Sequence, residues 1–390
     1  MDDSVDIDFD ESNDENQIQT DPTLNIEEQY KKGLFRVVYQ YNTFFIPQII
    51  SMIGSNSVLN LQPEYQRRLR WDNKRKSLLI ESLLLNIPVP PLFFYEKDMA
   101  IYEVMDGQQR LTTVNDFYNN AFRLTGLSIL GQLDGLFYKD LHPIFKKGLD
   151  RAALSVNVLL LESEEKEKDP YQIRRYVFER INTGGIALNN QEIRNSLYSS
   201  EFNNTLLEIS RENIFTACWD IPPYDQKQEY DSPERKRNTL YKNMYDCQLI
   251  LRFFALINEI NIRGSMKSIL DRCMQDNLHT SREECLKMKD IYLHCLQTAT
   301  RIFGDHPFNI NVENKRKKNS APLYDAIMVA LYKNKDNVDN LVRNSKTISF
   351  ALDALLLTED GYDLFVGRGN TAANIKDRIR KITTLFSNIQ

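Results

Sequence analysis

The sequence predicts an α+β domain that ends near residue 200, followed by a mostly α-helical region that extends to residue 390. Three observations support this. Short apolar runs typical of strands occur only before residue 162. After the charged, proline-containing segment 162–170 the apolar residues recur at helical spacing. Finally, hydrophobic residues make up 42% of the chain, which is enough to bury a sizeable core in each part.

The first elements can be placed from local signals. An amphipathic helix is predicted from Phe45 to Ile53 and a short strand from Val58 to Leu61. Asp72 is placed to cap a second helix, which runs to about Leu85. Asn86-Ile87-Pro88 ends that helix because proline lacks the N–H that a helix needs.

A hairpin and a second strand–helix unit follow. The apolar runs 92–96 and 101–105 predict two strands, with Lys97-Asp98 as the turn. Residues 108–118 then return to helical periodicity, and residues 156–161 predict another buried strand. The best-defined helices of the remaining chain are 171–181, 190–198, 201–211, 238–258, 283–302 and 320–333.

Charge is distributed unevenly along the chain. Residues 1–28 contain eleven Asp or Glu and no Lys or Arg, although the net charge of the whole chain is only −5. Such a segment cannot bury enough apolar surface to offset the entropy of ordering, so we expect a disordered acidic tail. The tail is either a solubilising extension or a cover for a basic groove. The remainder carries 49 basic and 43 acidic side chains, a mild excess that permits nucleic-acid binding.

Several classes of protein are disfavoured. No apolar run approaches the roughly 20 residues of a membrane span, and the acidic N-terminus lacks a signal-peptide pattern, so a cytoplasmic protein without a membrane partner is expected. The five cysteines form no C-x-x-C pair, which predicts reduced cysteines packed as small hydrophobic residues. Walker P-loop, H-E-x-x-H and G-x-S-x-G motifs are also missing.

The most informative segment is Asp106-Gly107-Gln108-Gln109-Arg110, between a predicted strand and the polar start of a helix that continues through Thr112. A helix N-terminus attracts phosphate, and Gly107 lets the backbone approach a ligand. Arg110 can grip phosphate oxygens with two donors, a glutamine can orient an attacking water, and Asp106 can hold a metal or accept a proton. The alternative is structural, because Asp-Gly is a common turn and Asp106 can simply cap the helix.

Two further segments suit phosphate chemistry. In Tyr65-Gln66-Arg67-Arg68-Leu69-Arg70-Trp71 three arginines lie between two aromatic residues, which suits phosphate contacts combined with base stacking. A solvated basic face is the alternative. In Asn182-Thr183-Gly184-Gly185 the two glycines can form an anion-binding nest, or they can merely end a helix. Arg194, in the following helix, either points toward the same site or lies on an exposed face.

Together these segments resemble the N-terminal domain family of GmrSD-type restriction proteins, which also occurs in phage-defence proteins that sense modified DNA. The resemblance covers about residues 33–200 and rests on four ordered motifs. They are Tyr65-Gln66-Arg67-Arg68 with Trp71, Ile87-Pro88-Val89-Pro90-Pro91, Asp106 to Arg110, and Arg180 to Gly185. Asp246 to Phe253 and Asn319 to Met328 resemble the helical continuation of the family more loosely.

The resemblance implies a ParB/sulfiredoxin-like fold whose Asp-Gly-Gln-Gln-Arg turn binds and hydrolyses a nucleoside triphosphate with Mg²⁺. Three groups of site residues are implied. Asp106, Gln108, Gln109 and Arg110 are the expected catalytic residues, and Asp106 is the expected metal ligand. Gly107 and Thr112 belong to the same turn and helix. The remaining expected nucleotide- or DNA-binding residues are Tyr65, Gln66, Arg67, Arg68, Asn182, Gly184 and Gly185.

The chain departs from many relatives in its histidines. A His-Asn-His nuclease needs closely placed histidines, whereas His142, His279, His294 and His306 are scattered and no second histidine follows Asp305-His306-Pro307. We therefore expect DNA cleavage to require a separate nuclease subunit.

Three functions are consistent with the sequence. The first is an NTPase of a restriction or phage-defence system whose nucleotide state controls binding to DNA, modified or not. The second is a nucleotide switch without turnover. The third is a DNA-binding or partner-binding module with a structural turn. Because successive helix residues diverge by about 100°, only one of Gln108 and Gln109 is expected to face inward.

Overall fold

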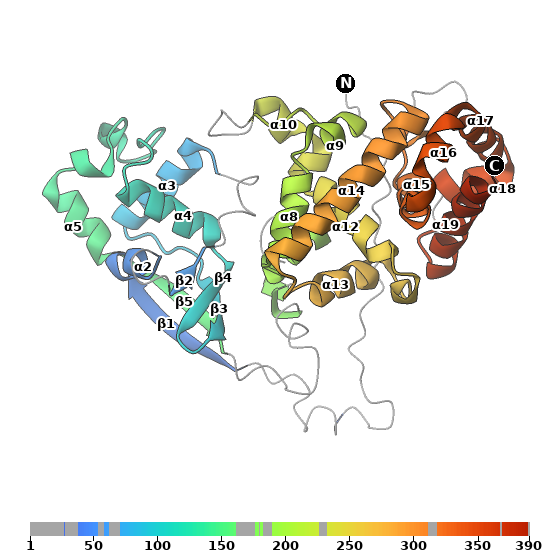
Figure 1. The fold of residues 1–390 in the computed structure, drawn as a ribbon. Helices are drawn as coiled ribbons and strands as arrows, with labels where there is room; N and C mark the ends of the chain where they lie inside the picture. The colour runs from blue at the N-terminus through green and yellow to red at the C-terminus, as the bar shows by residue number, and fades with distance from the viewer. Residues whose placement is uncertain are drawn as a thin grey trace. The chain divides into compact units, whose positions relative to one another are not determined.

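The computed structural model describes residues 27, 38–53, 58–61, 71–160, 176–178, 180–181, 189–225, 232–310, 318–366 and 369–388 (Figure 1), without the side chains of residues 318 and 359. The predictions for the acidic tail, for 65–68, for 171–175 and for 182–185 lie outside these residues, except that Glu27 is described. Contacts divide the described chain into two compact units, one that ends before Asn189 and one that begins there.

The first unit is an α+β domain, as predicted. Its strands form one mixed sheet in the order β1-β5-β3-β4-β2 (Figure 1). β5 pairs antiparallel with β1 and parallel with β3, β3 pairs antiparallel with β4, and β2 pairs parallel with β4. The bounds are β1 Tyr39–Phe45, α2 Ile46–Ile53, β2 Leu59–Asn60, α3 Asn73–Leu84, β3 Leu92–Asp98, β4 Ile101–Asp106, α4 Gln108–Tyr118, α5 Pro143–Arg151 and β5 Ala153–Leu159.

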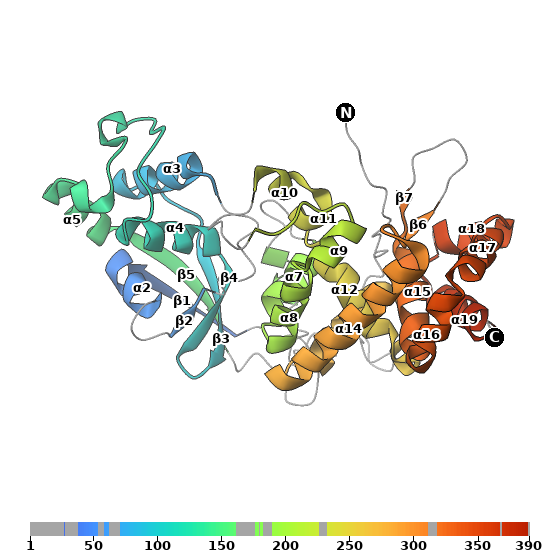
Figure 2. The ribbon, with the colours of Figure 1, turned by 45° about the horizontal axis from the view of Figure 1, so that its top comes forward.

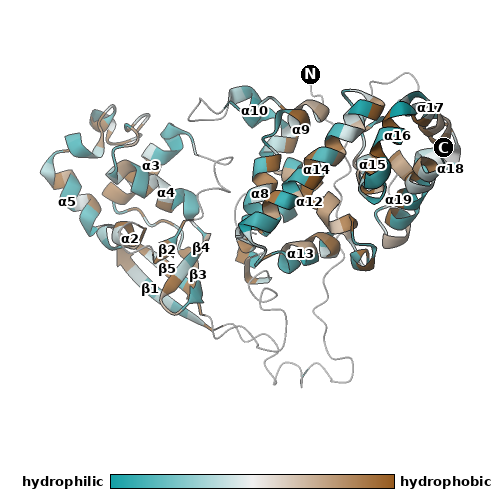
Figure 3. Cartoon of the chain, viewed as in Figure 1, coloured by the Kyte–Doolittle hydropathy of each residue, from teal (hydrophilic) through white to brown (hydrophobic). Residues whose placement is uncertain are grey.

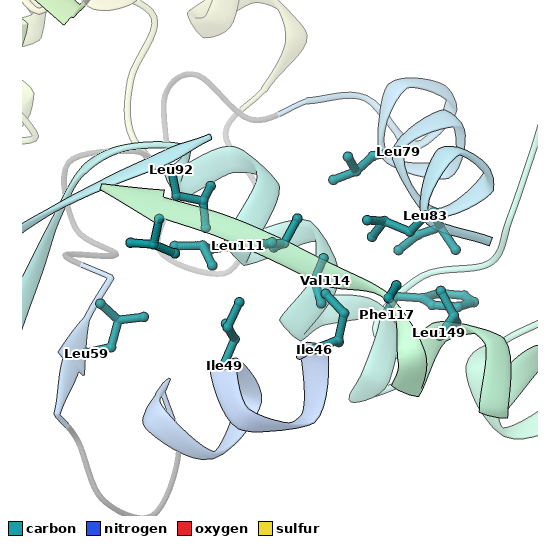
Figure 4. Packing of buried hydrophobic residues seen from close by; sticks show 14 of the residues in the cluster. Ile46, Ile49, Leu59, Leu79, Leu83, Leu92, Leu111, Val114, Phe117 and Leu149 are labelled. Atoms are coloured by element: carbon teal, nitrogen blue, oxygen red, sulfur yellow. The ribbon is translucent and has the colours of Figure 1, made fainter. Parts of the chain in front are cut away.

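One face of the sheet forms the core with the four helices. Successive strand residues point to opposite faces, so Leu154, Val156 and Val158 of β5 all face this core. Side chains of all four helices belong to the same core. Figure 4 shows some of them packed together, among them Ile49 of α2, Leu83 of α3, Leu111 of α4 and Leu149 of α5. Burying this apolar surface is what holds the helices on the sheet.

Local signals placed most of these elements correctly. Asp72 caps α3 as predicted, because its side chain accepts a hydrogen bond of 2.7 Å from the N–H of Arg75. The predicted hairpin turn at Lys97-Asp98 is wrong: β3 continues through Asp98, and the turn is Met99-Ala100. Lys97 belongs to the strand, where its Nζ lies 2.9 Å from Glu103 of β4.

The carboxylate of Glu81 fixes the loop that follows α4. Although Glu81 is only 4% exposed, its oxygens accept N–H hydrogen bonds from Ser128, Ile129 and Leu130, at 3.0, 2.7 and 2.7 Å. Burial alone would raise the pKa of Glu81, but the three donors outweigh it and lower the pKa. The ionised side chain therefore stabilises the folded state.

We expect Glu81→Gln to lower the free energy of unfolding by about 1–3 kcal/mol at pH 7, because hydrogen bonds to an ionised acceptor are stronger than those to a neutral one. Since the pKa of Glu81 is lowered on folding, this stabilisation is present above the unfolded pKa and lost as pH falls through the folded pKa. Urea denaturation should therefore show the gap between variant and wild type closing below about pH 4. Glu283→Gln, which changes a carboxylate that is 79% exposed, should show no such gap at either pH.

The second unit is helical apart from one short strand pair. The long α14 packs against α8 and α15, and α12 packs against α8, α13 and α15 (Figure 2). Figure 3 shows hydrophilic and hydrophobic residues alternating around α14, as expected for a helix with one buried face. The main helices are α7 Asn190–Leu197, α8 Glu201–Ile209, α9 Asn213–Cys218, α11 Thr239–Lys242, α12 Tyr245–Leu256, α13 Met266–Asp276, α14 Arg282–Phe303, α15 Ala321–Lys333, α17 Ser345–Leu356 and α19 Ala372–Ser387. The shorter elements are α10 Pro233–Arg237, α16 Val338–Arg343, α18 Glu359–Val366, β6 Asn309–Ile310 and β7 Lys318–Asn319.

The single helix predicted for 238–258 is instead two, α11 and α12. The break is at Met244, whose φ of +57° no helix residue adopts. The side chain of Asn189 donates a 2.9 Å hydrogen bond to the carbonyl of Asn243, so a residue 54 positions away fixes the break.

Two arginines share one aspartate in the core of this unit. Arg252 of α12 donates to both oxygens of Asp325 in α15, at 2.9 and 2.5 Å, and Arg378 of α19 donates to the second oxygen at 2.9 Å. All three side chains are at most 1% exposed. The cluster thereby joins α12, α15 and α19.

All five cysteines are free and buried, as predicted. Burial raises the pKa of the thiols of Cys218, Cys273 and Cys295 to about 12. Within the described residues, no helix combines the length and apolar character needed to cross a membrane.

Candidate functional site

The Asp106–Arg110 segment forms the turn between β4 and α4, as predicted. Gly107 is the N-cap of α4 and has φ +92°, a left-handed conformation that favours glycine. A Cβ on Gly107 would lie 2.1 Å from Cδ2 of Leu92 and 3.1 Å from Nη2 of Arg110. Glycine is thus required both by the backbone and by the close packing of β3 against the turn.

Arg110 is held across this turn by oxygen atoms on both sides. Its Nη2 lies 2.9 Å from Oδ2 of Asp106. Its Nη1 donates to the carbonyl of Pro90, and both terminal nitrogens lie 3.4 Å from the carbonyl of Pro91. Burial lowers the pKa of Arg110 and the charge of Asp106 counteracts this, so the guanidinium is charged and fixed in one orientation.

Asp106 is more accessible than its partner. The side chain is 39% exposed, whereas that of Arg110 is 11% exposed. Within the part of the chain that the structure describes, Oδ1 of Asp106 has no hydrogen-bond donor, and no group of three His, Cys, Asp or Glu is placed to hold a metal. A metal at this turn would therefore have at most two carboxylates from the described residues, of which Asp106 would be one. That suits Mg²⁺, which binds through one or two carboxylates together with substrate phosphates and water.

The two glutamines occupy different environments. Gln108 is buried at 6% exposure, so it is the inward-facing one of the pair. Gln109 is half-buried, and its Oε1 accepts a 3.2 Å hydrogen bond from the backbone N–H of Trp71. Thr112 lies one turn further along α4 and is half-buried. The bond from Trp71 to Gln109 ties the start of α4 to the residue that precedes Asp72, the N-cap of α3.

Comparison with protein families finds a match over most of the first unit and over α7 of the second. Residues 46–199 match the family model of the GmrSD restriction endonuclease, N-terminal domain. Residues 46–199 form a GmrSD N-terminal domain. Neither the curated proteins nor the solved structures contain a significant match to the chain.

The Asp106–Arg110 turn lies inside the GmrSD N-terminal domain, whereas β1 precedes the matched residues and α8 follows them. The structure does not describe the other expected site residues of the domain, namely Tyr65, Gln66, Arg67, Arg68, Asn182, Gly184 and Gly185. Their contribution to the site stays a prediction.

Arg194 differs from both alternatives considered from the sequence. It lies within the match to the GmrSD N-terminal domain, yet it is 1% exposed and its Nε donates a 2.7 Å hydrogen bond to Asp271 of α13. This buried pair joins α7 to α13, so Arg194 is a structural residue of the helical unit.

Three contacts of the turn were not predicted. They are the carbonyls of Pro90 and Pro91 on Arg110, the side chain of Leu92 against Gly107, and the Trp71 N–H on Gln109. The sequence signal for them was the Ile87–Pro91 segment, one of the four motifs on which the predicted resemblance rests. Proline has no N–H but keeps its carbonyl as an acceptor, so consecutive prolines present acceptors without competing donors.

Proposed function

We propose that this chain is a nucleoside-triphosphate hydrolase of a DNA-restriction or phage-defence system, in which the nucleotide state controls binding to DNA. The observation that carries the proposal is the Arg110–Asp106 pair, fixed at a strand–helix turn within a GmrSD N-terminal domain. A guanidinium and a carboxylate held side by side can bind a phosphate oxygen and a metal ion at adjacent positions.

Each residue has a role that follows from its position. Oδ2 of Asp106 orients Arg110, while Oδ1 is accessible and can bind Mg²⁺. The Pro90 and Pro91 carbonyls hold the guanidinium of Arg110 in place, and its positive charge neutralises phosphate charge. A Mg²⁺ ion held by Asp106 would add charge neutralisation on the phosphate oxygens. Gln108, the buried glutamine, is the candidate for orienting the attacking water, since a glutamine has that role in other NTPases.

The partners follow from the domain type. A domain named for a restriction endonuclease supports DNA, modified or unmodified, as the partner. Outside the acidic first 28 residues the chain has a small excess of basic side chains, which is compatible with phosphate contacts. We propose that a separate nuclease subunit makes the cut, because the four histidines are scattered along the sequence.

One observation favours a second function, a nucleotide switch without turnover. The amide oxygen of Gln109 already accepts the Trp71 N–H, and an oxygen so engaged is a poorer acceptor for the proton of an attacking water. If Gln108 does not reach the water, the same turn binds the nucleotide without hydrolysing it, and the bound nucleotide changes the affinity for DNA.

Phosphate release from each of the four common nucleoside triphosphates tests the proposal, with Mg²⁺ and with or without duplex DNA. The matched variants are Asp106→Ala and Asp98→Ala, which change carboxylates at opposite ends of the β3–β4 hairpin. Turnover that is lost only in Asp106→Ala supports the hydrolase, and a DNA effect ties it to restriction. Nucleotide binding without turnover supports the switch. Folded protein that binds no nucleotide at all rejects both.

A further inference from the structure

β1 is an edge strand of the sheet, and no other strand of the described residues pairs with its outer side. In its antiparallel pairing with β5, the N–H of Leu160 donates to the carbonyl of Val38 at 2.9 Å, and the N–H of Ile46 donates to the carbonyl of Ala152 at 3.0 Å. Residues on an antiparallel strand alternate between facing the partner and facing away. The odd-numbered residues Tyr39 to Phe45 therefore direct their N–H and C=O groups away from β5.

Among the described residues, most of these outward N–H and C=O groups have no hydrogen-bond partner. Of the described residues, only Gln48 bonds to them, through its Oε1, which accepts the N–H of Phe45 at 2.8 Å. The opposite edge of the sheet is different, because β2 has two residues, and a short edge strand offers little to pair with. β1 has seven.

The composition of β1 does nothing to prevent pairing. Its sequence, Tyr-Gln-Tyr-Asn-Thr-Phe-Phe, contains no charge, proline or glycine, and proteins normally use charge or proline to block open edges. The side chains of the outward residues are also exposed. Tyr39 is 55%, Tyr41 72% and Phe45 50% exposed, and the two tyrosine rings lie edge to face 5.2 Å apart.

We propose that β1 pairs with β1 of a second copy of this chain, antiparallel about a two-fold axis at Asn42. The outward residues are symmetric about Asn42, so with Asn42 opposite Asn42 the hydrogen-bonded pairs are Tyr41 with Thr43 and Tyr39 with Phe45. In the second pair the N–H of Phe45 exchanges the Gln48 side chain for the carbonyl of Tyr39. Because the strand is uncharged, no like charges face one another in this pairing. The contact uses the same residues of both copies, and it joins two five-stranded sheets into one continuous sheet.

Sedimentation of the full chain over a range of concentrations tests the pairing. Wild type should be dimeric, and Tyr41→Lys/Thr43→Lys should weaken the dimer by on the order of 100-fold, because lysines then face one another across the axis. Tyr41→Glu/Thr43→Glu should dissociate it equally. A one-to-one mixture of the lysine and glutamate variants should restore the dimer, since unlike charges then face each other. Both changed side chains are exposed, so circular dichroism should show an intact fold.

Ile129→Lys/Ile144→Lys is the matched control, because it adds the same charge at positions that are 69% and 67% exposed and outside β1. This variant should remain dimeric. A wild type that is monomeric throughout would overturn the proposal. A dimer that survives the double lysine change, or a mixture of the two charged variants that stays monomeric, would also overturn it. A dimer that survives the lysine change would place the interface on another surface. A mixture that stays monomeric would show that β1 does not face β1. None of these results depends on nucleotide turnover.

Discussion

Replacing Asp325 with alanine is expected to lower the free energy of unfolding by about 3–5 kcal/mol, because two buried guanidinium groups would be left without their shared counter-charge. Asp325 and Arg378 are fully buried and Arg252 is 1% exposed, so water cannot take over the role of the carboxylate without partial unfolding. Burial already lowers the pKa of Arg378 to about 10, against the opposing effect of Asp325.

Arg378→Met should behave in the opposite way. Nε and Nη1 of Arg378 are buried and have no hydrogen-bond acceptor among the residues that the structure describes. Removing this side chain leaves a neutral Arg252–Asp325 pair and eliminates two unsatisfied donors, so the stability should change little or rise.

Chemical denaturation followed by tryptophan fluorescence measures both changes in the helical unit. Trp219 is 2% exposed and packs edge to face on Tyr324, the neighbour of Asp325, with ring centroids 5.4 Å apart. Asp336→Ala removes an exposed carboxylate of the same unit and should leave the midpoint unchanged. Equal stability of Asp325→Ala and Asp336→Ala would show that the buried charges are compensated in some other way.

Arg110→Ala should reduce NTP turnover by about 10²–10³-fold, the usual cost of removing a preorganised donor to a developing negative charge. Arg110→Lys should recover only a small part of this. A single ammonium has three donors, so it cannot keep the contacts to Asp106 and to both proline carbonyls and also bind a phosphate oxygen. This expectation depends on the proposed hydrolase.

The control is Arg123→Ala, which removes an exposed arginine of the same unit that lies over the ring of Phe137. Its turnover should equal that of the wild type. Binding of a fluorescent nucleotide analogue, measured in parallel, separates a loss of affinity from a loss of chemistry. Full turnover in a folded Arg110→Ala protein would remove Arg110 from the site.

The elements that the sequence predicted well have local causes. Asp72 caps α3 through a residue three positions away, and Gly107 allows the turn through its own φ. The missed features depend on distant residues. The break before α12 requires Asn189, and the burial of Arg194 requires Asp271, 77 positions later. Contacts between residues so far apart in the sequence cannot be predicted from local periodicity.

In the candidate site, too, the locally determined features were predicted and those that depend on distant residues were missed. The turn that carries Asp106 and Arg110 was visible in the sequence because a strand, a glycine and a helix follow one another there. The orientation of Arg110 was not visible, because it is set by carbonyls of Pro90 and Pro91 about 20 positions earlier. β1 was missed because its exposed face is aromatic instead of polar, so the usual alternation is weak.

The burial of every cysteine has a practical consequence. Maleimides and other thiol reagents attack the thiolate, which is scarce at neutral pH when the pKa is near 12 and is inaccessible in a packed core. A cysteine introduced at an exposed position of the folded protein would therefore be labelled selectively without removing any native one. Fluorophores or spin labels can then be attached to the otherwise unaltered chain, one on each unit, to follow its response to nucleotide and DNA.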